Sequence, residues 1–153
     1  MNEVIEALDN LHEALEKLRA LGVIRSQKWT ADYGEWLVAK LFASDLAESC
    51  TQSGWDIEID GKKVQIRTSF IPQKGPRYTR CKVNEDFDEL IVVGLTEKMR
   101  IGKIYHIDKE RLKPLIRNGS ESRVNWSDLD PYSVKLNDLA SNKGMTQFLT
   151  ILD

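Results

Sequence analysis

The segment from Gly54 to Phe70 constrains the fold more than any other part of the chain. It reads GWDIEIDGKKVQIRTSF and places a turn-forming Asp60-Gly61 pair between two runs of alternating apolar and polar residues. This pattern predicts a β-hairpin with one dry face, carrying Trp55, Ile57, Ile59, Val64 and Ile66. The opposite face carries the polar set Asp56, Glu58, Gln65 and Arg67. A hairpin with one ordinary solvated face is the alternative interpretation.

Length and composition predict one globular domain over residues 1–153. The chain is 41% hydrophobic and 30% charged, and no apolar run approaches the ~20 residues that a membrane helix needs. The acidic start MNEVIEALDN lacks the layout of a signal peptide. We therefore expect a cytoplasmic protein with no membrane contact. Cys50 and Cys81 are expected to be packing residues, and two histidines, His12 and His106, do not make a zinc motif.

Positive charge is concentrated directly after the hairpin turn. The net charge is −2, but residues 61–84 contain no Asp or Glu and carry +7. Cations interleaved with Phe70 and Tyr78 can follow a phosphate backbone and stack a base. The candidate nucleic-acid contacts are Lys62, Lys63, Lys74, Arg77, Arg80 and Lys82. A solvated basic loop is the alternative.

Helices are predicted on both sides of this region. Leucines and a valine recur in steps of four and three from Val4 to Leu18, which predicts an amphipathic helix over residues 2–21. We expect this helix to pack on the domain, with a homodimer through residues 2–21 as the alternative. A second helix is predicted over residues 32–44, with Thr30 as its N-cap, and a third over residues 108–115, capped by Asp108.

The remaining elements are strands and irregular segments. Residues 90–95 (LIVVGL) form a continuous apolar run typical of a strand buried on both faces, and residues 103–107 predict a further strand. Residues 71–83 and 118–132 are expected to be loops, with a strand near 134–136 and a short helix over 147–152 at the end. The predicted class is α/β, of the α+β kind: a mixed sheet covered by helices, with core residues 30–115, an N-terminal helix 1–22 and an extension 116–153.

Three pieces in this order carry a family resemblance: GEWLVAKLF, then GWDIEIDGKKVQIRTS, then FDELIVVGL. Together they resemble the PD-(D/E)xK nuclease superfamily, and more narrowly its small bacterial domains of unknown function with a Gln-x-Lys motif. The similarity covers residues 33–112. It implies a restriction-endonuclease-like core and a bacterial or phage origin.

The resemblance also implies a set of catalytic residues. It assigns the helix glutamate to Glu35, the metal-binding aspartate to Asp56, the (D/E/Q) position to Gln65 and the lysine position to Arg67. Glu35, Asp56 and Gln65 would hold Mg²⁺ or Mn²⁺, hard ions that take oxygen ligands. Such an ion polarises a phosphate and activates water, while the cation stabilises the developing charge.

Two positions depart from the family pattern. Gln65 supplies a neutral oxygen in place of a carboxylate. Arg67 keeps the positive charge of the lysine but not its shape or its ability to carry a proton. Lys63 lies on the same face and could partly substitute, and Glu58 could be an extra ligand. The alternative interpretation makes Arg67 a structural partner of Glu35 or Asp56.

These observations predict a metal-dependent DNA phosphodiesterase, a Mg²⁺-dependent endonuclease if it is active, weakened by Arg67. A second hypothesis is a non-catalytic protein of nuclease fold that binds nucleic acid, most simply DNA, or a protein partner. A third is an interaction module whose N-terminal helix recruits a partner.

Overall fold

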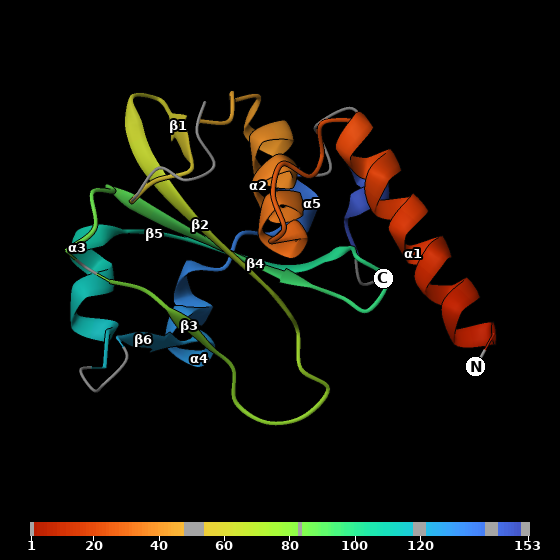
Figure 1. Ribbon diagram of the computed structural model, residues 1–153. Helices are drawn as coiled ribbons and strands as arrows, with labels where there is room; N and C mark the ends of the chain where they lie inside the picture. Colours follow the sequence, from red (N-terminus) through yellow and green to blue (C-terminus); the bar gives the residue numbers. More distant parts are fainter. Residues whose placement is uncertain (1, 48–53, 83, 118–121, 140–143, 151–153) are drawn as a thin grey trace.

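The sheet at the centre of the molecule mixes parallel and antiparallel pairs (Figure 1). The computed structural model describes residues 2–47, 54–82, 84–117, 122–139 and 144–150. Its longer elements are α1 (Asn2–Ala20), α2 (Trp29–Phe42), β1 (Ile57–Ile59), β2 (Lys62–Phe70), β3 (Tyr78–Arg80), β4 (Glu89–Leu95), β5 (Ile101–Asp108) and β6 (Arg123–Asn125). The short helical elements are α3 (Lys109–Leu112), η1 (Lys113–Leu115), α4 (Trp126–Leu129), η2 (Asp130–Tyr132), α5 (Leu136–Leu139) and η3 (Thr146–Phe148).

Strand pairing gives the main sheet the order β1-β2-β4-β5. β1 is antiparallel to β2, β2 is parallel to β4, and β4 is antiparallel to β5. β3 and β6 form a separate antiparallel ribbon. The predicted class, a mixed sheet covered by helices with an added N-terminal helix, is confirmed.

The predicted hairpin is present and its turn has the expected chemistry. Asp60 and Gly61 have φ angles of 50° and 78°, which suits the short type I′ connection between twisted strands. Ile57 lies opposite Val64, so the pairing register follows from the turn. β1 is only three residues long, and it therefore pairs with the first part of β2 alone.

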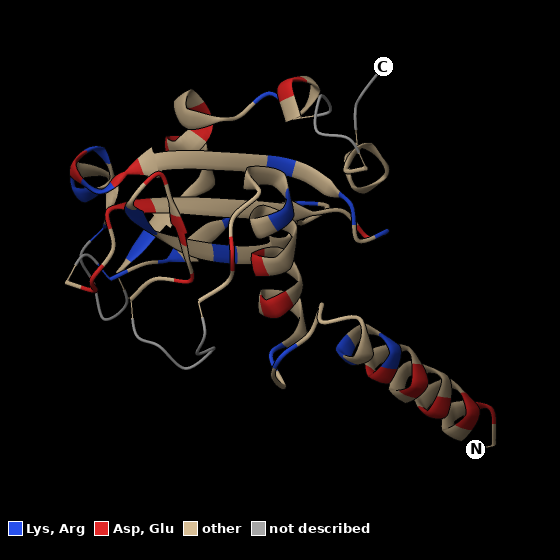
Figure 2. Ribbon diagram, turned by 90° about the horizontal axis from the view of Figure 1, so that it is seen from above, with Lys and Arg blue, Asp and Glu red and all other residues tan. Residues whose placement is uncertain are grey.

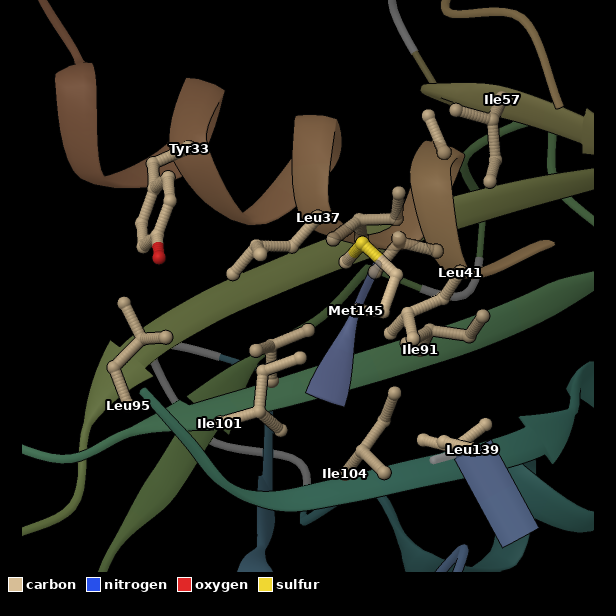
Figure 3. Packing of buried hydrophobic residues seen from close by; sticks show 14 of the residues in the cluster. Tyr33, Leu37, Leu41, Ile57, Ile91, Leu95, Ile101, Ile104, Leu139 and Met145 are labelled. Carbon is tan, nitrogen blue, oxygen red and sulfur yellow. The ribbon is translucent and has the colours of Figure 1, made fainter. Parts of the chain in front are cut away.

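β4 is buried on both faces, as its apolar run predicted. Ile91 and Val93 pack into the cluster beneath α2, whereas Leu90 and Val92 pack into a second cluster on the opposite face. Figure 3 shows Leu37 and other side chains of α2 meeting the sheet in the first cluster. The second cluster lies between the sheet and the layer formed by α3, α4 and the β3–β6 ribbon.

α2 begins earlier than predicted, and Thr30 does not cap it. The helix starts at Trp29, and the cap position, Lys28, makes no side-chain hydrogen bond. Instead Asp32, inside the first turn, accepts the backbone N–H groups of Arg25 and Ser26 at 2.8 and 2.5 Å. A carboxylate near a helix N-terminus is favoured by the helix dipole. The same contacts hold the incoming chain, and so place Arg25.

Two segments predicted as loops contain the β3–β6 ribbon. Tyr78 pairs with Asn125 and Arg80 with Arg123, and the ribbon buries Thr79 and Val124. The prediction missed it because each strand is only three residues long and gains its burial from the rest of the fold. The strand predicted near 134–136 is also wrong, since α5 begins at Leu136. The helix predicted over 147–152 is a short 3₁₀ turn at Thr146–Phe148. Residues 151 and 152 of the predicted helix, like Cys50, lie outside the described residues.

α1 matches its predicted bounds, and it packs on the domain only through its C-terminal part. None of its residues is buried, and the helix stands beside the rest of the molecule (Figures 1 and 2). Leu15 and Leu18 touch the first cluster, while Val4, Ile5, Leu8 and Leu11 are more than half exposed. None of the described helices combines the length and apolar character needed to cross a bilayer.

Candidate functional site

Asp56 lies at the edge of the sheet and not on one of its faces. Its Oδ2 accepts the N–H of Ile66 at 2.6 Å, and its own N–H donates to Val64 O at 2.9 Å. The carboxylate thus extends the short β1 along β2. The chain bends here, because Trp55 packs in the second cluster and Ile57 in the first. The expected common face for Asp56 and its polar neighbours is therefore wrong.

Charged side chains from both sides of the sheet act on the Asp56 carboxyl. Burial raises the pKa of its carboxyl, and Glu85 adds to the increase, while the Ile66 N–H, Arg67 and Arg25 lower it. A buried carboxyl with a raised pKa resists full ionisation.

Glu35 reaches this region from α2. Its Oε2 accepts a hydrogen bond from Arg25 Nη2 at 2.7 Å, and the two side chains are only 14% and 22% exposed. Burial raises the pKa of Glu35, the charge of Asp56 raises it further, and Arg25 lowers it. Arg25 Nη1 also donates to Ala47 O at 2.8 Å. The guanidinium is therefore held between Glu35 and the backbone on the approach to Asp56.

Gln65 is directed away from Glu35 and Asp56. It is 2% exposed, and its Nε2 donates to Glu85 Oε2 at 2.6 Å and to Gly54 O at 3.0 Å. Two acceptors around one atom identify that atom as the nitrogen. Its oxygen accepts from the Cys81 thiol at 3.7 Å. Burial raises the pKa of Cys81 to about 11, so the thiol stays protonated and suits this donor role.

Arg67 is held loosely, and not by the expected partners. Its Nη2 lies 3.5 Å from Glu85 Oε2, and its Nε lies 3.4 Å from Arg80 O. Its side chain is 38% exposed. The alternative in which Arg67 pairs with Glu35 or Asp56 is not what the structure contains, because Glu85 is its carboxylate neighbour. Lys63 pairs with Asp86 at 2.5 Å, and Glu58 is solvent-exposed, so neither contributes to the site.

The residues predicted to bind Mg²⁺ or Mn²⁺ do not fit a metal ion in this arrangement. Glu35 is occupied by Arg25, one oxygen of Asp56 by the Ile66 N–H, and the oxygen of Gln65 faces Cys81. Among the described residues, no three Asp, Glu, His or Cys side chains gather as a metal site would require. The Arg25 guanidinium already pairs with Glu35, so we derive no chemistry through a metal.

Three arginines, one of them Arg67, line a hollow next to the residues described above. Arg67 from β2 and Arg77 and Arg80 from the β3 region border a cleft of about 360 Å³. We call this hollow the basic groove, and its full lining is Arg67, Thr68, Ser69, Pro76, Arg77, Tyr78, Thr79 and Arg80. The groove exists because β1 stops short, which leaves the last residues of β2 without a paired strand on that side.

Arg77 is oriented by its surroundings before any ligand arrives. Its guanidinium lies over the ring of Trp126, 5.9 Å from the centroid, and its backbone carbonyl accepts the Trp126 N–H at 2.9 Å. Its Nε is buried and has no hydrogen-bond partner among the described residues. A guanidinium fixed beside the groove suits an oxyanion such as phosphate.

The other predicted basic contacts do not reach the groove. Lys62 pairs with Glu89 at 2.5 Å and Lys63 with Asp86, while Lys74 and Lys82 are exposed but do not line the hollow. Of the six predicted residues, the structure brings Arg77 and Arg80 together and adds Arg67. Figure 2 shows where Lys, Arg, Asp and Glu lie along the ribbon.

Sequence reasoning missed three residues that shape the site. Arg25 lies in a connecting loop, Glu85 follows the acid-free window, and Arg123 lies on β6, where its guanidinium packs on the Tyr78 ring at 5.0 Å. The one signal in the sequence was the position of Glu85 at the end of that window. Arg25 and Arg123 become neighbours of the site through tertiary contacts alone.

No protein-family model matches the sequence, and a search of curated proteins finds no significant match. The function proposed for this chain therefore rests on its own geometry.

Proposed function

We propose that this chain is a non-catalytic nucleic-acid-binding protein on a nuclease-like α/β core. The observation that carries the proposal is the convergence of Arg67, Arg77 and Arg80 on one groove. Guanidinium groups bind phosphate through two parallel hydrogen bonds, and they keep their charge at every physiological pH. Neutralising phosphates releases counterions, which supplies most of the affinity of such interfaces.

The contacts of Glu35 and Asp56 support the non-catalytic form of this proposal. A nuclease of the resembled superfamily would hold its ion with Glu35, Asp56 and Gln65. Here one carboxylate oxygen of Glu35, one of Asp56 and the amide oxygen of Gln65 each accept a hydrogen bond from a protein donor. Arg67 also stands where that pattern has lysine. The active alternative, a metal-dependent DNA phosphodiesterase, is tested by incubating plasmid, linear and single-stranded DNA with Mg²⁺ or Mn²⁺. Cleavage that disappears in Asp56→Ala would establish the alternative and overturn our proposal.

Binding is tested with fluorescently labelled oligonucleotides over a range of salt concentrations. The double variant Arg77→Gln/Arg80→Gln should weaken binding whatever the sequence of the probe. It should also reduce the slope of log K against log[salt] by roughly 0.7–0.9 for each phosphate that the protein no longer neutralises. Lys40→Gln/Lys135→Gln is the matched control, because it removes two exposed positive charges that do not line the groove. No retention at low salt, or equally weakened binding in both variants, would contradict the proposal.

A second candidate function, self-association through α1, has its own supporting observation. Val4, Ile5, Leu8 and Leu11 form an exposed apolar stripe on a helix that buries none of its residues. A helix of this length gains little stability from propensity alone. We propose that a second copy of the chain covers this stripe.

Charge favours an antiparallel arrangement of the two helices. Residues 2–13 contain four acidic residues and no Lys or Arg, whereas residues 14–21 contain Lys17 and Arg19 beside Glu16. A parallel arrangement would bring the acidic ends of the two helices together. Antiparallel helices place the acidic end of each copy along the basic end of the other, while the 4-3 spacing of the stripe allows the two seams to mesh.

A further inference from the structure

The two most exposed aromatic side chains of the described residues are Tyr78 and Phe70, and Tyr78 lines the basic groove. Tyr78, on β3, lines the hollow and is 41% exposed, and Phe70, at the end of β2, is 38% exposed. The remaining described aromatic residues are buried or only partly exposed. An exposed ring in the basic groove suits a ligand that presents a flat apolar face.

The β3–β6 ribbon presents its polar and aromatic residues on a single side. Along β3, Tyr78 and Arg80 are exposed while Thr79 is buried and accepts a hydrogen bond from Trp126 Nε1 at 2.8 Å. Across the ribbon, Arg80 pairs in register with Arg123. One outward face thus combines a ring with two guanidinium groups, while the inward face anchors the ribbon in the second cluster.

Tyr78 is supported in this position by its neighbour. The Arg123 guanidinium packs on the ring at 5.0 Å, a cation–π contact that favours one ring orientation. An oriented ring beside cations is the arrangement used for single-stranded nucleic acids, where bases stack on aromatic side chains and the backbone follows positive charge. In a duplex, neighbouring base pairs already cover the faces of each base, so the ring would have nothing to stack on.

We infer that the basic groove binds single-stranded nucleic acid, with an unpaired base stacked on Tyr78 and adjacent phosphates held by Arg67, Arg77 and Arg80. This inference rests on the proposed function and specifies its ligand. The groove then distinguishes nucleic acids by whether their bases are free, not by their sequence.

The first test compares a labelled 12-nucleotide oligo(dT) with the same strand paired to oligo(dA), both at low salt. The single strand should bind at least about tenfold more tightly, because stacking adds to the phosphate contacts. Tyr78→Leu keeps apolar bulk but removes the ring, and should lose that advantage without changing the salt slope. Tyr78→Phe keeps the ring and should retain it. Circular dichroism of each variant checks that the overall fold is retained.

The second test removes the base from the ligand. An oligonucleotide of the same length with abasic positions keeps every phosphate, so it should bind the natural protein about tenfold more weakly than intact oligo(dT) does, since the stacking is gone. The same abasic strand should bind Tyr78→Leu as well as intact oligo(dT) does. Equal affinity for duplex and single strand, or a weaker affinity of Tyr78→Leu for the abasic strand than for oligo(dT), would overturn the inference while leaving the proposed function. No binding of any probe would overturn the proposed function itself.

Discussion

Arg25 Nη2 lies 2.7 Å from Glu35 Oε2, with both side chains largely buried. Arg25→Gln would leave Glu35 beside Asp56 without its cation, and we expect a loss of about 2–3 kcal/mol in the free energy of unfolding. Arg19→Gln removes a more exposed pair with Glu16 and should cost under about 1 kcal/mol. Urea denaturation of both variants provides the comparison. Equal losses in the free energy of unfolding would show that the buried pair stabilises the protein no more than the exposed pair does.

Divalent metals should stabilise the natural protein very little. If Mg²⁺ or Mn²⁺ binds with a dissociation constant above about 5 mM, then about 5 mM metal adds less than about 0.4 kcal/mol. Thermal denaturation with and without metal measures this. In Arg25→Gln the carboxylates lose their built-in cation, and the metal-dependent stabilisation should increase. Saturable metal binding by the natural protein that is lost in Asp56→Asn would contradict the prediction.

Asp56→Asn should make stability less dependent on pH. The Asp56 carboxyl has a raised pKa in the folded protein, chiefly through burial, so the folded state holds its proton more tightly than the unfolded state. Its ionisation therefore costs stability as pH rises from the ordinary value of 3.8 through the folded pKa. Asn can still accept the Ile66 N–H. The melting temperature of the variant minus that of the natural protein should increase between about pH 3 and pH 7. A difference that stays constant over this range would refute the prediction.

Leu8→Lys/Leu11→Lys should convert a dimer to a monomer. The substitutions place charges in the exposed stripe of α1, where a second copy would bury them unpaired. Sedimentation velocity over a range of protein concentrations measures the change. Asn137→Lys/Gln147→Lys, which adds two positive charges at exposed positions outside α1, is the control for added positive charge. A natural protein that stays monomeric at high concentration would exclude self-association through α1.

Gly34→Ala should destabilise the protein by about 1–3 kcal/mol, because a Cβ at this position would fall on the Thr68 side chain. The close approach of α2 to β2 depends on this glycine. Thr68→Gly removes the obstructing atoms, so the double variant should recover part of the loss relative to Thr68→Gly alone. Denaturation of the four proteins forms the cycle. Additive effects would show that the two residues do not meet.

Several elements could be predicted because their signal is local. The Asp60-Gly61 turn requires left-handed backbone and fixes the hairpin, and the apolar run of β4 needs cover on both faces. Asp108 caps α3 as predicted, since its side chain accepts the Arg111 N–H at 2.9 Å. These features depend on neighbours in the chain, so their physics is visible in the sequence.

The site depended on contacts that no local pattern encodes. Alternation predicted one face for Asp56, Gln65 and Arg67, but a bend before β1 moves Asp56 to the sheet edge. Gln65 is buried, and its hydrogen bonds with Glu85 and Cys81 direct its side chain away from Asp56. The seven positive charges of residues 61–84 were plain in the sequence. Which of them share a groove was decided by tertiary structure, because β3 pairs with a strand more than 40 residues later and only that pairing places Arg77 and Arg80 beside Arg67.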